Sequence, residues 1–560
     1  MKIQYITNII LFLGIFNYSA YAQWNTNSQI NNSITNQPND QKAVNMVTDS
    51  KHGAIIGWLD FRRDTTRGDI YAQRIDAQGY NKWSTNGAIV CNNDSNQAAM
   101  SMIEDGFGGA IFAWNDWRSG NRDIYAQRID SNGTLLWTSS GQAVAVKPFH
   151  QKTPKLVTDG NGGAFITWID SSNVSWDIYA QHINASGTNL WANSGLPICT
   201  ATGSQTNPRI ETDNNGGAII VWQDKRNGAD YDIYAQRVNS AGTIQWATNG
   251  IIVCSTIGTQ SGQKIRSDMQ GGAYIVWQDK RNGIDYNIYA QRISPAGSRL
   301  WSANGILICN ATGLQNSIDI TNENIMNGLI ISWKDERKGT KNADIYAQKI
   351  DISGIIQWPV NGTAISSAIF NQQNPNTCGD GTGGAIISYQ DSSSGTWDIR
   401  CQRIDSIGNI RWQTGGAVLS NATYSQTTPI NISDNLGGTI AAWQDKRNTI
   451  EWDVFASHYN PNWINVGIST KVHEPRAAVT IFPNPATNQV NISLKQIPLT
   501  SKEKMSIDIS DIHGNCMYKT TSEKNDFFEI NTTEFVNGLY FYKIYTKDTF
   551  LDCGKFVVQK

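Results

Sequence analysis

A tryptophan-centred motif returns about every 55 residues along most of this 560-residue chain. One copy runs from Gly216 through Trp222 to Asp224, and is followed by the segment 232–237 and by a second Trp-centred segment, 242–250. A period of this length is typical of arrays in which each unit packs on its neighbours. Eight copies are present, and we expect their shared aromatic and acidic residues to be structural: Trp58 and Asp60, Trp114 and Asp116, Trp168 and Asp170, Trp222 and Asp224, Trp277 and Asp279, Trp333 and Asp335, Tyr389 and Asp391, Trp443 and Asp445.

Each copy contains four short apolar runs separated by turn residues. In the fourth copy they are Pro208–Thr212, Ala218–Gln223, Ile233–Val238 and a run between Thr243 and Cys254. The second run is apolar on both faces, so a strand there must be covered on both sides. Four antiparallel strands per unit, closed into a ring, predict an all-β chain with an eight-bladed β-propeller over 23–463. An open solenoid or two four-bladed rings are the alternatives.

A closed ring needs a strand that joins its two ends. Gln23-Trp24-Asn25-Thr26-Asn27 resembles 245–249, the fourth-strand segment of a copy, and precedes the first full copy. We expect it to pair with the last blade and remove a free edge. Trp463 is the other candidate for that strand.

The eight cysteines do not indicate a disulfide framework. Cys91, Cys199, Cys254 and Cys309 occupy one slot in four different copies, too far apart for bridges, and are expected to be buried thiols. Cys516 and Cys553 share the C-terminal region, where a bridge between them is left open.

Both ends of the chain differ from the repeats. Lys2, the apolar run 9–16 and Ala20-Tyr21-Ala22 are typical of a signal peptide covering 1–22, too short to span a membrane. Residues 464–478 have the composition of a linker, and the short alternating runs of 479–560 favour a small β-sandwich.

The C-terminal region resembles a known family, the type A sorting domains of the type IX (Por) secretion system of Bacteroidetes. The matching segments are Ile481-Phe482-Pro483-Asn484-Pro485-Ala486, Ile509-Ser510-Asp511-Ile512-His513-Gly514, Asn537-Gly538-Leu539-Tyr540 and Lys555-Phe556-Val557-Val558-Gln559-Lys560, with Cys516 a minor departure. The resemblance implies the type IX machinery as a partner and passage across the outer membrane. It also implies loss of the domain, followed by release or by attachment to surface polysaccharide.

The charge balance gives no bulk attraction to nucleic acid or to an anionic membrane. Lys and Arg number 45 against 47 Asp and Glu, a formal net charge of −2. No later segment is apolar for long enough to span a bilayer. We therefore expect an exported monomer, either released or held at the outer-membrane surface.

The chain lacks the local motifs of metalloproteases, serine hydrolases and phosphate-binding enzymes, and we assign no catalytic residue. Its carboxylates recur instead in two series. One follows the repeated Trp, and in six copies an Arg stands two residues later. The other ends the next loop, at Asp69, Asp123, Asp177, Asp232, Asn287, Asp344, Asp398 and Asp453. Near-uniform series favour loop-stabilising contacts; calcium binding or acid catalysis are the alternatives, and no other cofactor is indicated.

Aromatic residues near these acids vary from copy to copy and are our candidate ligand contacts. The loops that carry them join the second and third strands and should open on one face. Aromatic rings beside polar groups suit sugar binding, although packing against a blade is the alternative. The leading hypothesis is a non-catalytic module for a glycan or another extracellular macromolecule; the rivals are a sialidase-like hydrolase or lyase and a structural or adhesive protein. The candidates are Phe61, Trp117, Trp176, Tyr231, Tyr286, Trp397 and Trp452.

Overall fold

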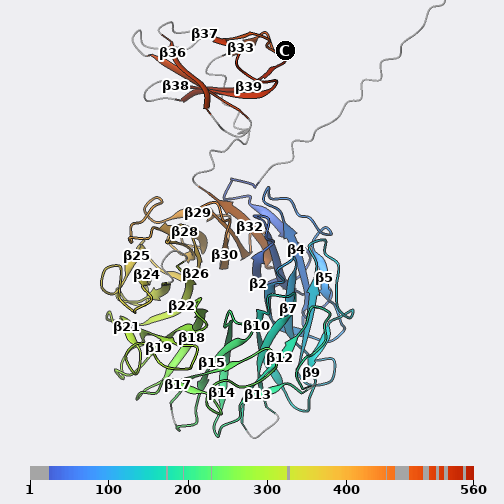
Figure 1. Ribbon diagram of the computed structural model, residues 1–560, viewed down its shortest axis with the longest axis vertical. Coiled ribbons are helices and arrows are strands. Elements are labelled where there is room, and N and C mark those ends of the chain that lie inside the picture. Colours follow the sequence, from blue (N-terminus) through green and yellow to red (C-terminus); the bar gives the residue numbers. More distant parts are fainter. Residues whose placement is uncertain are drawn as a thin grey trace, which may run out of the picture. The chain divides into compact units, whose positions relative to one another are not determined.

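The chain folds as repeated four-stranded antiparallel sheets, which confirms the all-β propeller (Figure 1). The computed structural model describes residues 24–171, 175–192, 194–228, 230–323, 328–448, 451–460, 478–495, 504–511, 516–522, 527–545 and 550–560. The expected signal peptide, Trp463 and nearly all of the expected linker lie outside these ranges. The described residues up to Asn460 form one compact unit, and those from Ala478 form a second.

The first strand of every blade lies innermost and contacts the first strands of both neighbouring blades. Contacts between β30 and β2 carry this inner circle past the ends of the repeat array. The first strands are β2 (Gln41–Thr48), β6 (Gln97–Glu104), β10 (Gln151–Thr158), β14 (Gln205–Thr212), β18 (Gln260–Ser267), β22 (Gln315–Asn322), β26 (Gln372–Gly379) and β30 (Gln426–Ser433).

The second strands are the most deeply buried part of each blade. In β7 and β15 all seven residues are buried, as two-sided apolar runs require. The second strands are β3 (Ala54–Asp60), β7 (Ala110–Asp116), β11 (Ala164–Asp170), β15 (Ala218–Asp224), β19 (Ala273–Asp279), β23 (Leu329–Asp335), β27 (Ala385–Asp391) and β31 (Thr439–Asp445).

Third strands pair along their whole length with second strands, and short fourth strands form the outer edge of each blade. The third strands are β4 (Asp69–Ile75), β8 (Asp123–Ile129), β12 (Asp177–Ile183), β16 (Asp232–Val238), β20 (Asn287–Ile293), β24 (Asp344–Ile350), β28 (Asp398–Ile404) and β32 (Asp453–Tyr459). The fourth strands are β5 (Ala88–Cys91), β9 (Gln142–Ala145), β13 (Leu196–Cys199), β17 (Ile251–Cys254), β21 (Ile306–Cys309), β25 (Thr363–Ser366), β29 (Ala417–Ser420) and, in the last blade, β1 (Asn32–Thr35).

The N-terminal stretch supplies the outer strand of the eighth blade. β1 pairs with β32, although the paired residues 32–35 follow the Trp24 segment rather than coincide with it. Trp24 has a different task, because its indole Nε1 donates to Ala77 O in the first blade at 3.0 Å. The same bond joins other neighbouring blades, as from Trp246 Nε1 to Pro295 O at 3.0 Å. Strand pairing and indole contact therefore both cross the junction between the ends of the array.

A glycine before the fourth strand lets the repeated Trp lie flat inside the blade. Gly250 has φ of +87°, and a Cβ atom there would be 2.5 Å from Trp222 Cη2. Neither the backbone conformation nor the space would accept another residue easily. The slot cysteines Cys91, Cys199, Cys254 and Cys309 are buried free thiols beside this region.

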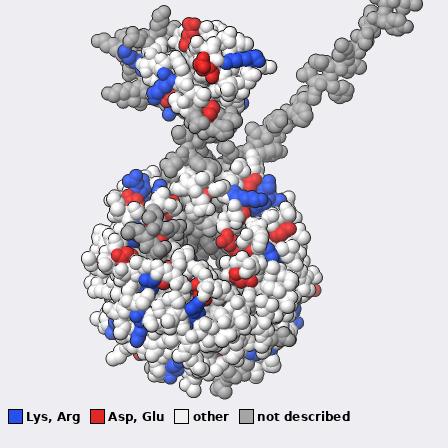
Figure 2. Space-filling model, viewed as in Figure 1, with Lys and Arg blue, Asp and Glu red and all other residues white. Residues whose placement is uncertain are grey.

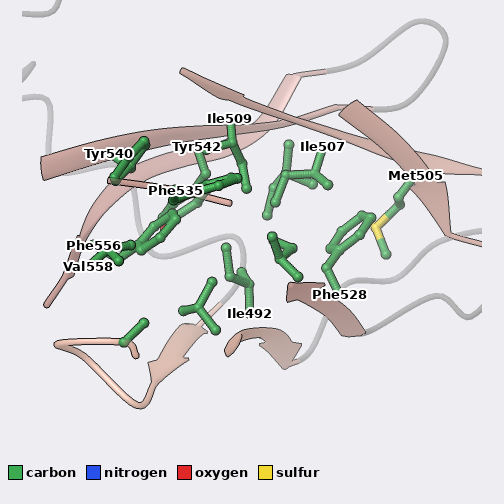
Figure 3. Packing of buried hydrophobic residues seen from close by; sticks show 14 residues of the cluster. Ile492, Met505, Ile507, Ile509, Phe528, Phe535, Tyr540, Tyr542, Phe556 and Val558 are labelled. Atoms are coloured by element: carbon green, nitrogen blue, oxygen red, sulfur yellow. The ribbon is translucent and has the colours of Figure 1, made fainter. Parts of the chain in front are cut away.

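The C-terminal unit consists of two sheets around one core. One sheet has the order β33 (Ala478–Phe482), β34 (Gln489–Lys495), β37 (Phe527–Asn531), and the other β36 (Cys516–Ser522), β35 (Met505–Ser510), β38 (Gly538–Tyr545), β39 (Phe550–Val558). Ile492 and Phe528 from the first sheet pack toward Ile507 and Tyr542 from the second (Figure 3). Cys516 carries a free thiol, and the side chain of Cys553 lies outside the part of the chain that the structure describes.

Equivalent indoles on the closing junction and on an internal one test whether the ring is closed in solution. Trp24 is 6% exposed and Trp246 is 9% exposed. We expect Trp24→Ala and Trp246→Ala each to lower the free energy of unfolding by about 3–5 kcal/mol, measured by urea unfolding. Ile257→Ala, at a residue 88% exposed, is the control and should change it by less than about 0.5 kcal/mol. A Trp24→Ala effect no larger than this control would mean that the ends of the array do not meet.

Candidate functional site

The loops between second and third strands gather at one end of the propeller with the connections between blades. Backbone hydrogen bonds join the two sets, as from Trp117 N to Asn96 O at 3.2 Å and from Lys225 N to Ser204 O at 3.0 Å. We call this end the loop face. All seven candidate aromatics belong to these loops, and every one of them is half-buried.

In six blades the acid of the first series belongs to a buried Trp–Asp–Arg clamp. In the fourth blade Trp222 Nε1 donates to Asp224 Oδ2 at 2.8 Å, and Arg226 donates to both carboxylate oxygens at 2.9 and 2.6 Å. The Arg226 guanidinium also lies 3.9 Å from the centre of the Tyr234 ring, and Asp224 has no exposed surface. These contacts take up the carboxylate, leaving it unsuited to a ligand, a metal or acid–base chemistry.

Charge-assisted hydrogen bonds set the ionisation of the clamp. Burial alone would raise the pKa of Asp116, but hydrogen bonds from Arg118 and Trp114 outweigh it and hold the pKa below its ordinary value. Two blades lack the Arg and use another cation. Lys147 Nζ lies 2.9 Å from Asp170 Oδ2, and Arg400 Nε lies 3.6 Å from Asp391 Oδ2.

The second acid series lies at the starts of the third strands and behaves differently. Burial raises the pKa of Asp453 to about 6, although a hydrogen bond from Asn448 acts against it. Burial likewise raises the pKa of Asp69 to about 6. The fifth blade has uncharged Asn287 at the equivalent place. A negative charge at these positions is therefore tolerated rather than required.

A third acid series was missed by the sequence reasoning. Asp213 Oδ1 accepts from the backbone N–H groups of Asn215 and Gly217 at 2.8 and 2.7 Å, and Arg237 Nε donates to its Oδ2 at 2.8 Å. These residues form the turn between first and second strands. The sequence signal was an Asp four residues before the second Gly, matched by a basic residue near the end of the third strand. Its contacts are structural.

Cations lie beside five of the seven candidate rings. The Lys225 and Lys280 Nζ atoms lie 4.8 and 5.9 Å from the centres of Tyr231 and Tyr286, and Lys446 lies 4.8 Å from Trp452. The other two pairs involve Trp117 and Trp176. Such contacts hold aromatic rings in place while leaving part of each ring in solvent.

Phe61 and Trp397 are the candidates without such a cation among the described residues. Phe61 packs against the apolar cluster shared by the first two blades, and its ring lies beside Gly68. Trp397 sits at a blade junction, where its carbonyl accepts a hydrogen bond from Gln426 N at 2.7 Å. Both side chains are half-buried, so burial does not separate the two candidates.

The second and third blades carry the most distinctive cluster on the loop face. The Arg122 guanidinium lies 4.6 Å from the centre of Trp117, and Lys152 Nζ lies 4.4 Å from the centre of Trp176. His150 accepts a hydrogen bond from Arg122 N at 3.3 Å. Slight desolvation and the cations of Lys152 and Arg122 lower the pKa of His150 below its ordinary value. We call these five residues the blade 2–3 cluster. Sequence reasoning found its two Trp residues but not Arg122, His150 or Lys152, which match no motif.

Among the described residues, no three His, Cys, Asp or Glu side chains are grouped so as to hold an ion. The same part of the chain has no helix long and apolar enough to cross a membrane. In the view of Figure 2, acidic and basic side chains form small separate patches on a largely uncharged surface.

Comparison with known families decides the role of the C-terminal unit. The family model described as a secretion system C-terminal sorting domain matches residues 480–559. This unit is a secretion-system sorting domain. It directs the chain to the cell surface or the exterior and implies interaction with the type IX machinery.

No curated protein is significantly similar to the chain. Solved structures with some likeness include an endo-arabinase from Bacteroides thetaiotaomicron, 15% identical, covering 47% of this chain and 95% of that chain with a TM-score of 0.28. A polysaccharide lyase described as an ulvan lyase is 9% identical, covering 76% and 94% with a TM-score of 0.40. An α-L-arabinofuranosidase of Fusarium graminearum is 9% identical, covering 55% and 92% with a TM-score of 0.32. At these values the account of the propeller rests on its own strands and contacts.

Asp453→Asn should stabilise the propeller at neutral pH. A carboxyl whose pKa is about 6 in the folded chain and about 3.9 in the unfolded chain favours folding below pH 3.9 and loses that contribution as the pH rises through 6. The variant removes this loss, so its unfolding free energy should exceed that of the parent by about 1–2 kcal/mol at pH 8, with the difference shrinking toward pH 4. Chemical unfolding across this pH range measures it. Asp445→Asn, in the clamp, should instead destabilise at every pH; stabilisation by both or by neither contradicts the assignment.

Removal of residues 479–560 should leave the propeller folded and stop its export. The sorting domain has its own hydrophobic core, which includes no residue of the propeller. In the producing bacterium we expect the truncated chain to accumulate in the periplasm, measured by fractionation and immunoblotting. Appearance of the truncated chain in the medium or on the cell surface would contradict this role.

Proposed function

We propose that the propeller is a non-catalytic binding module that holds an extracellular glycan on its loop face. The observation that carries the proposal is the set of half-buried aromatic rings on that face, most of them next to a cation. A half-buried ring is fixed in position yet keeps a face for the C–H side of a sugar. Neighbouring Lys, Arg and Asn side chains supply donors for hydroxyl groups.

The state of the carboxylates supports binding rather than catalysis. Glycoside hydrolysis ordinarily needs two carboxyl groups open to the same sugar. Asp116 and Asp224 are saturated by their clamps, and Asp213 by its turn. The second series is nearly buried, with Asp453 5% exposed and Asp69 1% exposed.

The alternative is a carbohydrate-active enzyme, and one observation favours it. His150 is exposed and lies among the cations of the blade 2–3 cluster, which lower its pKa and so favour the neutral imidazole that a general base needs. Glycan turnover that is abolished by His150→Ala would replace the binding proposal with this one.

A glycan array probed with the mature chain, residues 23–560, tests the proposal. Once a glycan is identified, Trp117→Ala and Trp397→Ala should each weaken its binding about 10-fold or more. The reason is that each substitution removes an aromatic face on which a sugar ring can stack. Phe107→Ala is the matched control, since Phe107 is 66% exposed and lies in a turn between first and second strands. An empty array, or equal effects of all three substitutions, would refute the proposal.

A further inference from the structure

The innermost strands hold a feature that the loop face does not explain. Every first strand contains a bulge at its third residue, which has positive φ even where that residue is β-branched, as at Thr153 with φ of 53°. Bulges re-aim the side chains that follow them. Two residues after each bulge residue comes the same register position in all eight blades, occupied by Asn45, Ser101, Lys155, Arg209, Lys264, Asp319, Asn376 and Ile430.

This position lies on the innermost strand of each blade, and solvent partly reaches it at Lys155, Arg209 and Lys264. Lys264 Nζ spans to the next blade and lies 3.1 Å from Asp319 Oδ1, so side chains here extend between neighbouring first strands. The Lys264 side chain is nevertheless 35% exposed, although β18 is an innermost strand. Lys155 and Arg209 are half-buried at the same level.

Three cations occupy this position in consecutive blades, and only one has a carboxylate. Asp319 pairs with Lys264 and also accepts from Asn376 Nδ2 at 3.1 Å and Thr377 N at 2.8 Å, so both its oxygens are engaged. Lys155 and Arg209 make no ion pair with any described residue. The acid nearest along β14 is Glu211, which faces Arg266 at 3.6 Å.

From this arrangement we infer that Lys155, Arg209 and Lys264 form an anion-binding site on the propeller axis, for a sulfate or carboxylate group, free or carried by a saccharide. Three cations at one register position of consecutive first strands, with one engaged acid beside them, are the chemistry that recognises an oxyanion. The site lies deeper than the blade 2–3 cluster, since Lys152 precedes the bulge on the same strand as Lys155. Anion binding at this site does not depend on glycan binding at the loop face.

The electrostatics of Lys155 agree with an incomplete site. Burial, together with the charges of Arg209 on β14 and Lys264 on β18, lowers the pKa of Lys155 to about 8. The neighbouring positions on β6 and β11 are uncharged Ser101 and Thr167. An anion placed among the three cations would favour the protonated lysine and raise this pKa.

Isothermal titration of the mature chain with inorganic sulfate tests the site, with glucuronate as the carboxylate probe and glucose as the neutral one. We expect sulfate or glucuronate to bind and glucose not to bind. Lys155→Gln combined with Arg209→Gln should weaken anion binding at least 10-fold. Lys82→Gln combined with Arg299→Gln, two exposed cations, removes the same charge and should change binding less than twofold. Equal losses in both double variants, or no binding of either anion, would overturn the inference.

Proton uptake gives a readout that needs no variant. At pH 8 the unliganded Lys155 is partly deprotonated, so anion binding should take up a fraction of a proton, seen as a binding enthalpy that changes with the buffer's ionisation enthalpy. Binding without uptake would overturn the role of Lys155. Trp117→Ala should leave sulfate binding unchanged, so an empty glycan array with intact sulfate binding would refute the loop-face proposal alone.

Discussion

The structure depends on burial of the second strands from both sides. In β7 and β15 no residue keeps appreciable exposure, so each blade needs a neighbour on either face. An array of such blades has two uncovered ends unless it closes. Pairing of β1 with β32 and the contact of Trp24 with Ala77 close it, and both are made by residues that precede the first repeat. Ring closure is thus the condition under which such apolar strands can exist in water.

Burial on this scale also dictates how charge is handled. Each second strand ends in an aspartate with no solvent contact, which would be costly without partners. In six blades the indole, the guanidinium and the loop backbone supply them, and an aromatic ring of the third strand covers the guanidinium, as for Asp224, Arg226 and Tyr234. A carboxylate satisfied in this way fixes a loop. The regular acids are therefore part of the scaffold, and ligand chemistry has to be sought at positions where the copies differ.

The sequence was sufficient for the fold because the fold is periodic. The spacing of Trp58, Trp114 and their equivalents, with two-sided apolar runs between turn residues, predicts the number of blades and the strands of each. Strand bounds differ by a few residues; β14 starts at Gln205 rather than Pro208 because the bulge at Asn207 lets earlier residues join the sheet. The closing strand also lies later in the chain than predicted. The Trp24 segment resembles the Trp-centred segment of a repeat, and in each blade the residues that pair as the fourth strand follow that segment.

The candidate sites were only partly predictable. Aromatic residues in the loops between second and third strands stand out when the copies are compared, so Trp117 and Trp176 were found. Whether a ring is open or packed depends on its neighbours in space, which the spacing of residues in the sequence does not give. The blade 2–3 cluster and the axial cations join residues from different copies, and no motif links Arg122 to Lys152 or Lys155 to Lys264. The sequence signal of Lys155, Arg209 and Lys264 is a departure from the repeat at one register position.

That departure has a physical logic. The backbone of a first strand, its bulge and its pairing with the second strand are the same in all eight blades, whatever side chain follows the bulge. The position accepts Ile430, Asn45 and Asp319 as readily as Lys155, so its residue does not determine the fold. Lys155 is desolvated there and repelled by two other cations, so its charge lowers the stability of the folded propeller. An anion bound at this position would offset the repulsion between the cations. This relief of repulsion adds to the favourable free energy of anion binding.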